Sequence, residues 1–368
     1  MQVKQEEDTR IEGLNWYYNR TFRDLIRIFP IGNERQTFLI QAEELNKYVV
    51  IKRIKINNVL NGDDNFRKIL TEEYFLACCK KNRYFVEIID VLYSVDFRYI
   101  FFILKDEGVD LQMQINNKDF DYNIRIPDIS RHIIFQVVCG LKYLHDKNLS
   151  HNDIKPGNIV VSKEGKAKIC DMGSTGQVSR IRGGGTNGYL SPQALLGKER
   201  TKEDDMWSVG VVFLELLIQE EGIFSFEKKS HVETLKSLLK KFYDIELKAP
   251  RRNDDIYEDI IEYIFNNYYE SFEYKLKNFE ELNNKPYIYN EDKKLIQDLL
   301  EINPSKRLKA GQVLNLPMFR MYQLEQGDFI YKIEDYDKYL RKRIPDLKTF
   351  LKYLEEIKEK YIGFDIFI

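Results

Sequence analysis

The eight residues 151–158, His-Asn-Asp-Ile-Lys-Pro-Gly-Asn, form the most informative stretch of the sequence. Within it a carboxylate, Asp153, stands two residues before an amine, Lys155, and an amide, Asn158, closes the stretch. A second carboxylate, Asp171, follows thirteen residues later in the tripeptide Asp-Met-Gly. Asp and Asn are common in ordinary loops and turns, so any one of these residues alone would indicate little. The informative feature is their order and spacing.

Further motifs flank this stretch. Upstream, Val-Val-Ile-Lys at 49–52 ends a strand-like run. Downstream, 185–193 read Gly-Thr-Asn-Gly-Tyr-Leu-Ser-Pro-Gln, and 205–210 read Asp-Met-Trp-Ser-Val-Gly. Together with the two stretches above, these segments resemble, in chain order, five motifs of the eukaryotic-type protein kinase superfamily. The resemblance extends over roughly residues 22–320, and it implies that the chain transfers phosphate from ATP to a protein substrate.

The hydrophobic pattern agrees with the α+β, bilobal fold that the resemblance implies. Short runs rich in β-branched and aromatic residues predict strands at 22–31, 37–42, 47–56, 85–91 and 99–104. One helical stretch at 66–80 interrupts them. From about residue 127 the apolar residues recur with helical spacing, apart from a strand pair around 159–169. The sequence therefore predicts a small β-rich lobe followed by a larger helical lobe.

The predicted domain organisation has four parts. They are an N-terminal extension at 1–21, a kinase N-lobe at 22–107, a kinase C-lobe at 108–320 and a C-terminal helical extension at 321–368. The C-lobe contains an insertion at about 230–290, because Asp205 and Arg307 lie 102 residues apart, which exceeds the family norm. Amphipathic periodicity predicts helices in this insertion. They would offer a surface for a protein partner; the alternative is a decoration without a partner.

Composition and charge exclude several classes of protein. Hydrophobic residues make up 43% of the 368 residues, which excludes wholesale disorder. The 57 basic and 59 acidic residues nearly cancel, so no nucleic-acid partner is expected. The four cysteines form no disulfide framework in a chain of this length, the N-terminus has no apolar signal segment, and the most apolar stretch, 209–218, is too short for a membrane span. We expect an intracellular protein, cytoplasmic or nuclear.

The resemblance assigns roles to the residues of the central stretch. Phosphoryl transfer depends mostly on positioning and on neutralising charge. Asp153 would accept or orient the proton of the attacking hydroxyl, and Lys155 would place positive charge near the transferring phosphate. Asn158 and Asp171 would supply the hard oxygen ligands that Mg²⁺ prefers. ATP and Mg²⁺ are thus the implied cofactors. Lys155 and Thr186 are typical of Ser/Thr-directed members of the family, which favours Ser/Thr over Tyr.

The resemblance also implies a set of ATP-binding residues. Lys52 would hold the α- and β-phosphates, and a lysine in so apolar a strand is costly unless it is paired. Its partner would be an acidic residue on the predicted helix: Glu73 is preferred, and Glu72, one step around the helix, is the alternative. The full predicted set comprises Gly32, Leu39, Val50, Lys52, Glu73, Leu104 and Asp171.

Departures from the family pattern leave other functions open. The glycine-rich loop keeps only Gly32, and Glu34 adds a negative charge beside the expected phosphates. The second hypothesis is therefore a pseudokinase that acts as a binding or scaffolding module. A third is a small-molecule phosphotransferase with a similar His-x-Asp loop. The motifs at 186–192 and 205–210 argue against the third, because they build a peptide-docking surface.

Three departures lie in and around the activation loop, the segment from Asp171 to Gln193. Asn152 replaces the arginine that in many protein kinases binds a loop phosphate, and 180–185 contain no hydroxyl. Loop phosphorylation is therefore not expected to be required, and Thr186 is better explained as a hydrogen-bond partner of Asp153. Gln193 replaces a glutamate, so a neutral hydrogen bond to Arg307 should replace a buried ion pair.

Overall fold

The computed structural model describes ten segments of the chain. These are residues 25–31, 37–42, 47–55, 63–93, 99–116, 127–162, 164–178, 184–218, 231–243 and 289–325. They belong to two compact units. The chain passes from the first unit to the second between Glu107 and Gly108. Gly32, most of the predicted insertion and the predicted C-terminal helix lie outside the described residues. The predicted α+β architecture is confirmed.

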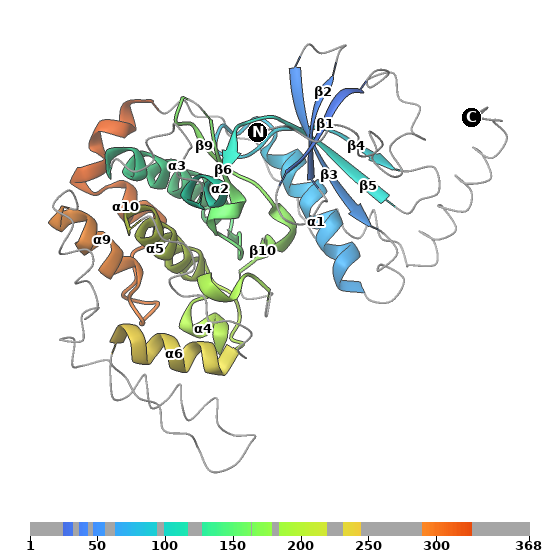
Figure 1. The fold of residues 1–368 in the computed structure, drawn as a ribbon. Helices are drawn as coiled ribbons and strands as arrows, with labels where there is room; N and C mark the ends of the chain where they lie inside the picture. Colours follow the sequence, from blue (N-terminus) through green and yellow to red (C-terminus); the bar gives the residue numbers. More distant parts are fainter. Residues whose placement is uncertain are drawn as a thin grey trace, which may run out of the picture. The chain divides into compact units, whose positions relative to one another are not determined.

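A five-stranded antiparallel sheet forms the first unit, in the order β1-β2-β3-β5-β4 (Figure 1). Its strands are β1 (Leu25–Ile31), β2 (Thr37–Ala42), β3 (Lys47–Lys55), β4 (Ile88–Tyr93) and β5 (Tyr99–Lys105). The central strands bury alternating or continuous apolar residues, as expected for half-covered and fully covered strands. The strand predicted from Phe85 begins instead at Ile88. Asn82 forms a turn through its side chain, which accepts from the Tyr84 N–H at 3.0 Å.

In the described part of this unit, one helix, α1 (Asp63–Cys79), accompanies the sheet. It buries Phe75, Leu76 and Cys79, which have no exposed surface, and it contacts β4. These apolar positions recur with the spacing that the sequence predicted for a helix. The helix ends at a turn, where the Asn82 N–H donates to the Cys79 carbonyl at 2.8 Å.

Helices dominate the second unit, with two small sheets beside them (Figure 1). The helices are α2 (Leu111–Asn116), α3 (Pro127–His145), α4 (Pro192–Leu195), α5 (Lys202–Ile218), α6 (His231–Tyr243), α9 (Asn290–Leu299) and α10 (Ala310–Leu314), followed by the 3₁₀ segment η6 (Pro317–Glu325). α3 and α5 pack side by side at the centre. Gly210 lets α9 approach α5, because a Cβ there would lie 2.9 Å from Leu299 Cβ. No described helix is long and apolar enough to cross a membrane.

The short strands of this unit carry the predicted motifs. One sheet has the order β6-β8-β9, formed by β6 (Val109–Asp110), β8 (Ile159–Val161) and β9 (Ala167–Ile169). The other pairs β7 (Leu149–Ser150) with β10 (Gly176–Gln177). Two single-turn 3₁₀ segments, η3 (Pro156–Asn158) and η4 (Met172–Ser174), begin shortly after the carboxylates Asp153 and Asp171.

Candidate active site

Asp153 lies at the centre of a cluster of polar side chains in the second unit. Its Oδ1 accepts from Thr186 Oγ1 at 2.8 Å, and its Oδ2 accepts from Asn158 Nδ2 at 3.0 Å. Lys155 Nζ lies 3.1 Å from Asp153 Oδ2 and donates to Thr186 Oγ1 at 2.9 Å. The predicted bond between Thr186 and Asp153 is confirmed. A carboxylate held by a hydroxyl, an amide and an ammonium group has a fixed orientation.

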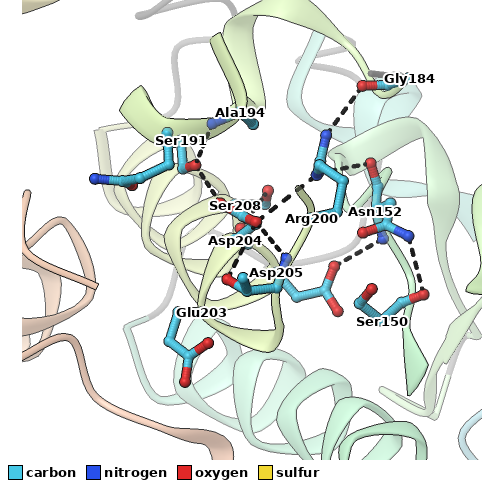
Figure 2. A network of polar contacts seen from close by, with 12 residues as sticks. Ser150, Asn152, Gly184, Ser191, Ala194, Arg200, Glu203, Asp204, Asp205 and Ser208 are labelled. Atoms are coloured by element: carbon cyan, nitrogen blue, oxygen red, sulfur yellow. Dashed lines mark hydrogen bonds and ion pairs between the residues drawn. The ribbon is translucent and has the colours of Figure 1, made fainter. Parts of the chain in front are cut away.

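The backbone of this loop is held by a buried carboxylate from α5. Asp205 has no exposed surface and accepts three hydrogen bonds, of which Figure 2 shows the one from Asn152. The donors are the His151 N–H at 2.8 Å, the Asn152 N–H at 2.8 Å and His145 Nε2 at 2.9 Å. Buried polar groups of this kind are costly unless they are paired, so the three donors and Asp205 depend on one another. These hydrogen bonds fix the backbone at His151 and Asn152, the two residues that precede Asp153.

Burial and hydrogen bonding act on Asp205 in opposite directions. Burial alone would raise the pKa of its carboxyl group. The hydrogen bond and electrostatic attraction of His145, with a smaller contribution from His151, nevertheless hold the pKa of Asp205 below its ordinary value of 3.8. The carboxylate is therefore the form that the folded loop stabilises.

The β8–β9 hairpin brings Asn158 and Asp171 to one end. Ile159 is paired in register with Ile169, and the Cys170 N–H donates to the Asn158 carbonyl at 2.9 Å. The two residues therefore flank the same open end of the hairpin, although they are thirteen residues apart in sequence. Asp171 adopts a left-handed φ of 57°, and its side chain accepts from the Gly173 N–H at 3.3 Å.

The donor set at this end fits a magnesium ion. Asn158 Nδ2 donates to both the carbonyl and the carboxylate of Asp153, at 2.8 and 3.0 Å, which leaves its Oδ1 as the acceptor atom. With the Asp171 carboxylate, Asn158 offers the oxygen ligands that Mg²⁺ prefers. In the described part of the chain, no three His, Cys, Asp or Glu side chains gather in a way that could hold a metal ion.

Lys52 in the first unit is paired with Glu72, and the preference for Glu73 was wrong. Lys52 Nζ donates to both carboxylate oxygens of Glu72, at 2.7 and 2.8 Å. The Glu72 side chain is 5% exposed and that of Lys52 is 25% exposed. Consecutive residues on a helix point about 100° apart, so only one of the two glutamates can face β3 in this way. Glu73 is half-buried on the neighbouring face.

Three other predicted ATP-binding residues lie in one row of the same sheet. Val50 on β3 is the register partner of Leu39 on β2 and of Leu104 on β5. Leu104 is 8% exposed and Val50 is half-buried. Lys52 lies two residues from Val50 on β3 and therefore on the same face of the sheet. Their contact with ATP stays a prediction.

Gln193 and Arg307 form the neutral hydrogen bond that the sequence predicted. Arg307 is 1% exposed, and its Nη2 donates to Gln193 Oε1 at 3.0 Å. Gln193 Nε2 in turn donates to the Ile302 carbonyl at 2.7 Å. The Gln193 amide therefore accepts a hydrogen bond through its oxygen and donates one through its nitrogen. An ionised glutamate could only accept.

Two buried charged residues near the loop escaped the sequence reasoning. Arg200 and Asp204 are each 1% exposed (Figure 2). Arg200 contacts Asn152 and Gly184, and Asp204 contacts Ser191. Arg200 stands within Lys-Glu-Arg-Thr-Lys-Glu at 198–203, a run of charges typical of a solvated surface. Nothing in that pattern distinguishes the buried residue from its neighbours.

Comparison with known proteins identifies the family. A model of the protein kinase domain matches residues 31–319. The chain is 24% identical to the mitogen-activated protein kinase pmk-3 of Caenorhabditis elegans over 321 residues, which make up 83% of this chain and 65% of that protein. It is 30% identical to Aurora kinase of Schizosaccharomyces pombe over 200 residues, or 53% of this chain and 44% of that protein.

A third relative is the dual specificity mitogen-activated protein kinase kinase dSOR1 of Drosophila melanogaster. It is 30% identical over 214 residues, which make up 55% of this chain and 49% of that protein. The chain thus spans less than two-thirds of the length of each of these relatives. Because the family model matches well over half of the chain, the chain belongs to the protein kinase family.

The Lys52–Glu72 pair gives a prediction with a matched control. Glu72→Gln should raise the KM for ATP about tenfold, because a bond between charged groups is worth about 1.5–3 kcal/mol and its loss frees Lys52 from its position. Glu73→Gln, one residue along the same helix, should change the KM less than about twofold. Steady-state kinetics at varied ATP measure both. Equal changes in the two variants would contradict the assignment.

Proposed function

We propose that this chain is a serine/threonine protein kinase that transfers the γ-phosphate of ATP in a magnesium-dependent reaction. The observation that carries the proposal is the cluster in which Thr186, Lys155 and Asn158 all bind the Asp153 carboxylate. A carboxylate fixed by three partners at a loop is suited to orient a hydroxyl group and accept its proton. The Lys52–Glu72 pair supports nucleotide binding and argues against the pseudokinase alternative.

Each residue of the site would have a separate role in the transfer. Bound Mg²⁺-ATP supplies the phosphoryl group and neutralises its charge. Asn158 and Asp171 would hold the metal through oxygen atoms. Asp153 would orient the substrate hydroxyl and take its proton, while Lys155 would attract the negative charge of the phosphoryl group. Lys52 would bind the phosphates.

Two observations support serine and threonine as the acceptors. Lys155 lies between Asp153 and Thr186 and contacts both, at 3.1 and 2.9 Å. This is the lysine–threonine combination that the sequence analysis associated with Ser/Thr-directed kinases. Two further relatives, KDX1 and PRR2 of Saccharomyces cerevisiae, are named serine/threonine-protein kinases. dSOR1 is named a dual specificity kinase, so tyrosine is the competing acceptor.

The test is transfer of radiolabelled phosphate from ATP to a generic protein substrate such as myelin basic protein, followed by acid hydrolysis and separation of the phosphoamino acids. We expect phosphoserine and phosphothreonine, with no transfer after EDTA and recovery on adding Mg²⁺. Phosphotyrosine alone would overturn the Ser/Thr assignment. ATP binding without transfer at any Mg²⁺ concentration would favour the pseudokinase.

Two further parts of the proposal concern cellular context. We propose an intracellular location, cytoplasmic or nuclear, on the composition and the reduced cysteines. None of the four cysteines, at 78, 79, 139 and 170, forms a disulfide, which supports a reducing compartment. We also propose that the insertion at about 230–290 contacts a protein partner or substrate. Deleting 250–285 and finding unchanged pull-down and unchanged kinetics would count against that contact.

The absence of a phosphate requirement gives a separate prediction. Asn152 carries no charge and its amide is already bound to two backbone carbonyls, so it cannot neutralise a phosphate dianion. Phosphatase-treated enzyme should therefore keep most of its activity, and Ser179→Ala should match wild type. Kinase assays before and after phosphatase treatment measure this. A loss of about tenfold or more, restored by a phosphate within 174–186, would contradict it.

A further inference from the structure

Asn152 is a junction between the Asp153 loop and two parts of the activation loop. Its Nδ2 donates to the Ser150 carbonyl at 3.2 Å and to the Ser174 carbonyl at 2.9 Å, just after the Asp171 turn. Its own carbonyl accepts from Arg200. Asn152 adopts a left-handed φ of 69° and is 1% exposed. Asn is among the residues that tolerate this conformation, so the replacement of arginine here suits the backbone.

Arg200 joins this junction to the far part of the activation loop. Its Nη2 donates to the Asn152 carbonyl at 3.0 Å, and its Nη1 donates to the Gly184 carbonyl at 3.0 Å (Figure 2). Its Nε lies 3.8 Å from Asp204 Oδ2, within ion-pair distance. The guanidinium group therefore spans two carbonyl groups from segments 32 residues apart, one on each side of Asp171 in sequence. A planar, forked cation is suited to this, because its nitrogens are held at fixed angles.

Asp204 links Arg200 to the C-terminal end of the activation loop. Its Oδ2 accepts from the Thr201 N–H at 2.6 Å, and its Oδ1 accepts from Ser191 Oγ. Ser191 Oγ also caps α4 by accepting from the Ala194 N–H at 3.1 Å. Asp204 thus compensates the buried charge of Arg200 and ties it to the end of the activation loop.

The approach of the activation loop to this junction requires a glycine. Gly185 has a φ of 86°, and a Cβ there would lie 2.6 Å from the Asn152 carbonyl oxygen and 3.3 Å from Arg200 Nη1. Gly184 has a similar φ of 77°, but a Cβ there would meet nothing within 4 Å. The two neighbours thus share a backbone conformation and differ in whether a side chain would press on the junction.

We propose that Arg200 is a positioning residue for phosphotransfer: it binds the Asn152 and Gly184 carbonyls and so holds the Asp153 loop against the activation loop without a phosphate group. This inference rests on the proposed kinase function. In this chain the guanidinium group of Arg200 holds the two loops together by binding backbone carbonyls. In many protein kinases the corresponding contact is made by an arginine that binds a phosphate group on the activation loop. Asp153 and its partner Thr186 belong to the two segments that Arg200 joins, so their contact depends on it.

The first experiment uses Arg200→Met and Arg200→Lys in the full chain. Arg200→Met should lower kcat by about tenfold or more and leave the KM for ATP within about twofold, because Lys52 and Glu72 are untouched. Arg200→Lys presents one nitrogen instead of two, so its kcat should fall between those of Arg200→Met and wild type. A kcat equal to wild type in Arg200→Met would overturn the proposal.

The second experiment leaves Arg200 in place and compares Gly185→Ala with Gly184→Ala. Both variants strain a left-handed backbone, but only Gly185→Ala pushes on the Asn152 carbonyl. The loss of kcat should be at least about fivefold greater for Gly185→Ala. Equal losses would overturn the proposal, because they would show that backbone strain alone matters.

Hydrogen exchange separates this inference from the proposed function, since it needs no activity. In Arg200→Met, amides in 150–153 and 184–190 should exchange faster than in wild type, while those of the β8–β9 hairpin at 159–169 should not change. Faster exchange throughout the second unit would indicate a general packing role and overturn the proposal. If wild type transfers no phosphate, the proposed function fails, and the exchange pattern still decides whether Arg200 joins the two loops.

Discussion

Asp153→Asn is expected to lower kcat by about 10²–10⁴-fold while the KM for ATP stays close to that of wild type. The amide has nearly the shape of the carboxylate, so Thr186 Oγ1 can still bind its oxygen. It cannot, however, take a proton from the substrate hydroxyl, and its NH₂ group would face the Asn158 or Lys155 donors that now bind Asp153 Oδ2. The loss should therefore fall on the chemical step rather than on nucleotide binding.

Steady-state kinetics with saturating Mg²⁺-ATP and a generic protein substrate measure this effect. Asp146→Asn is the matched control, because it makes the same chemical change at an exposed residue that directly follows α3 and whose partner is Lys142, at 2.6 Å. Its kcat should equal that of wild type. An Asp153→Asn enzyme as active as this control would show that the carboxylate takes no part in the reaction.

Asp205→Asn is expected to have the largest effect on stability, a loss of about 3–5 kcal/mol in the free energy of unfolding. The carboxylate accepts from two backbone N–H groups and from His145 Nε2, all buried. An asparagine keeps one acceptor oxygen and turns an NH₂ group toward the remaining donors. At least one buried donor would then lose its partner, which costs the full desolvation of that group.

The pH dependence of this effect follows from the direction of the pKa shift. The pKa of Asp205 in the folded chain lies below its ordinary value of 3.8, so the folded state favours the carboxylate. Its contribution to stability is complete above that ordinary value and is lost as the pH falls through the folded pKa. The stability difference between wild type and Asp205→Asn should therefore shrink as the pH falls below about pH 4.

Denaturant unfolding across this pH range measures both effects. Glu203→Gln is the matched control, since it removes an acid from the same first turn of α5 without touching the loop. It should change stability by less than about 0.5 kcal/mol. A stability difference for Asp205→Asn that did not shrink below about pH 4 would contradict the assigned role of the carboxylate.

Much of the fold and of the cluster around Asp153 could be predicted because their determinants are local. Strands and helices follow from alternating or helical spacing of apolar residues over short windows. Asp153, Lys155 and Asn158 lie within six residues of one another, so a tight loop brings them together without long-range packing. The contacts of Thr186 and Gln193 are long-range. They were predicted from the resemblance to the protein kinase motifs, not from local spacing.

The sequence by itself thus determined the class of fold, the order of the motifs and the residues that surround Asp153. Only the tertiary structure decided between Glu72 and Glu73, because neighbours on a helix differ by a rotation of about 100° that apolar spacing does not settle for two adjacent acids. Only the tertiary structure identified Arg200, whose two carbonyl partners lie 16 and 48 residues away in sequence. Its sequence surroundings are those of a solvated residue. Its burial follows from the packing of the activation loop on α5, which joins segments that no local pattern relates.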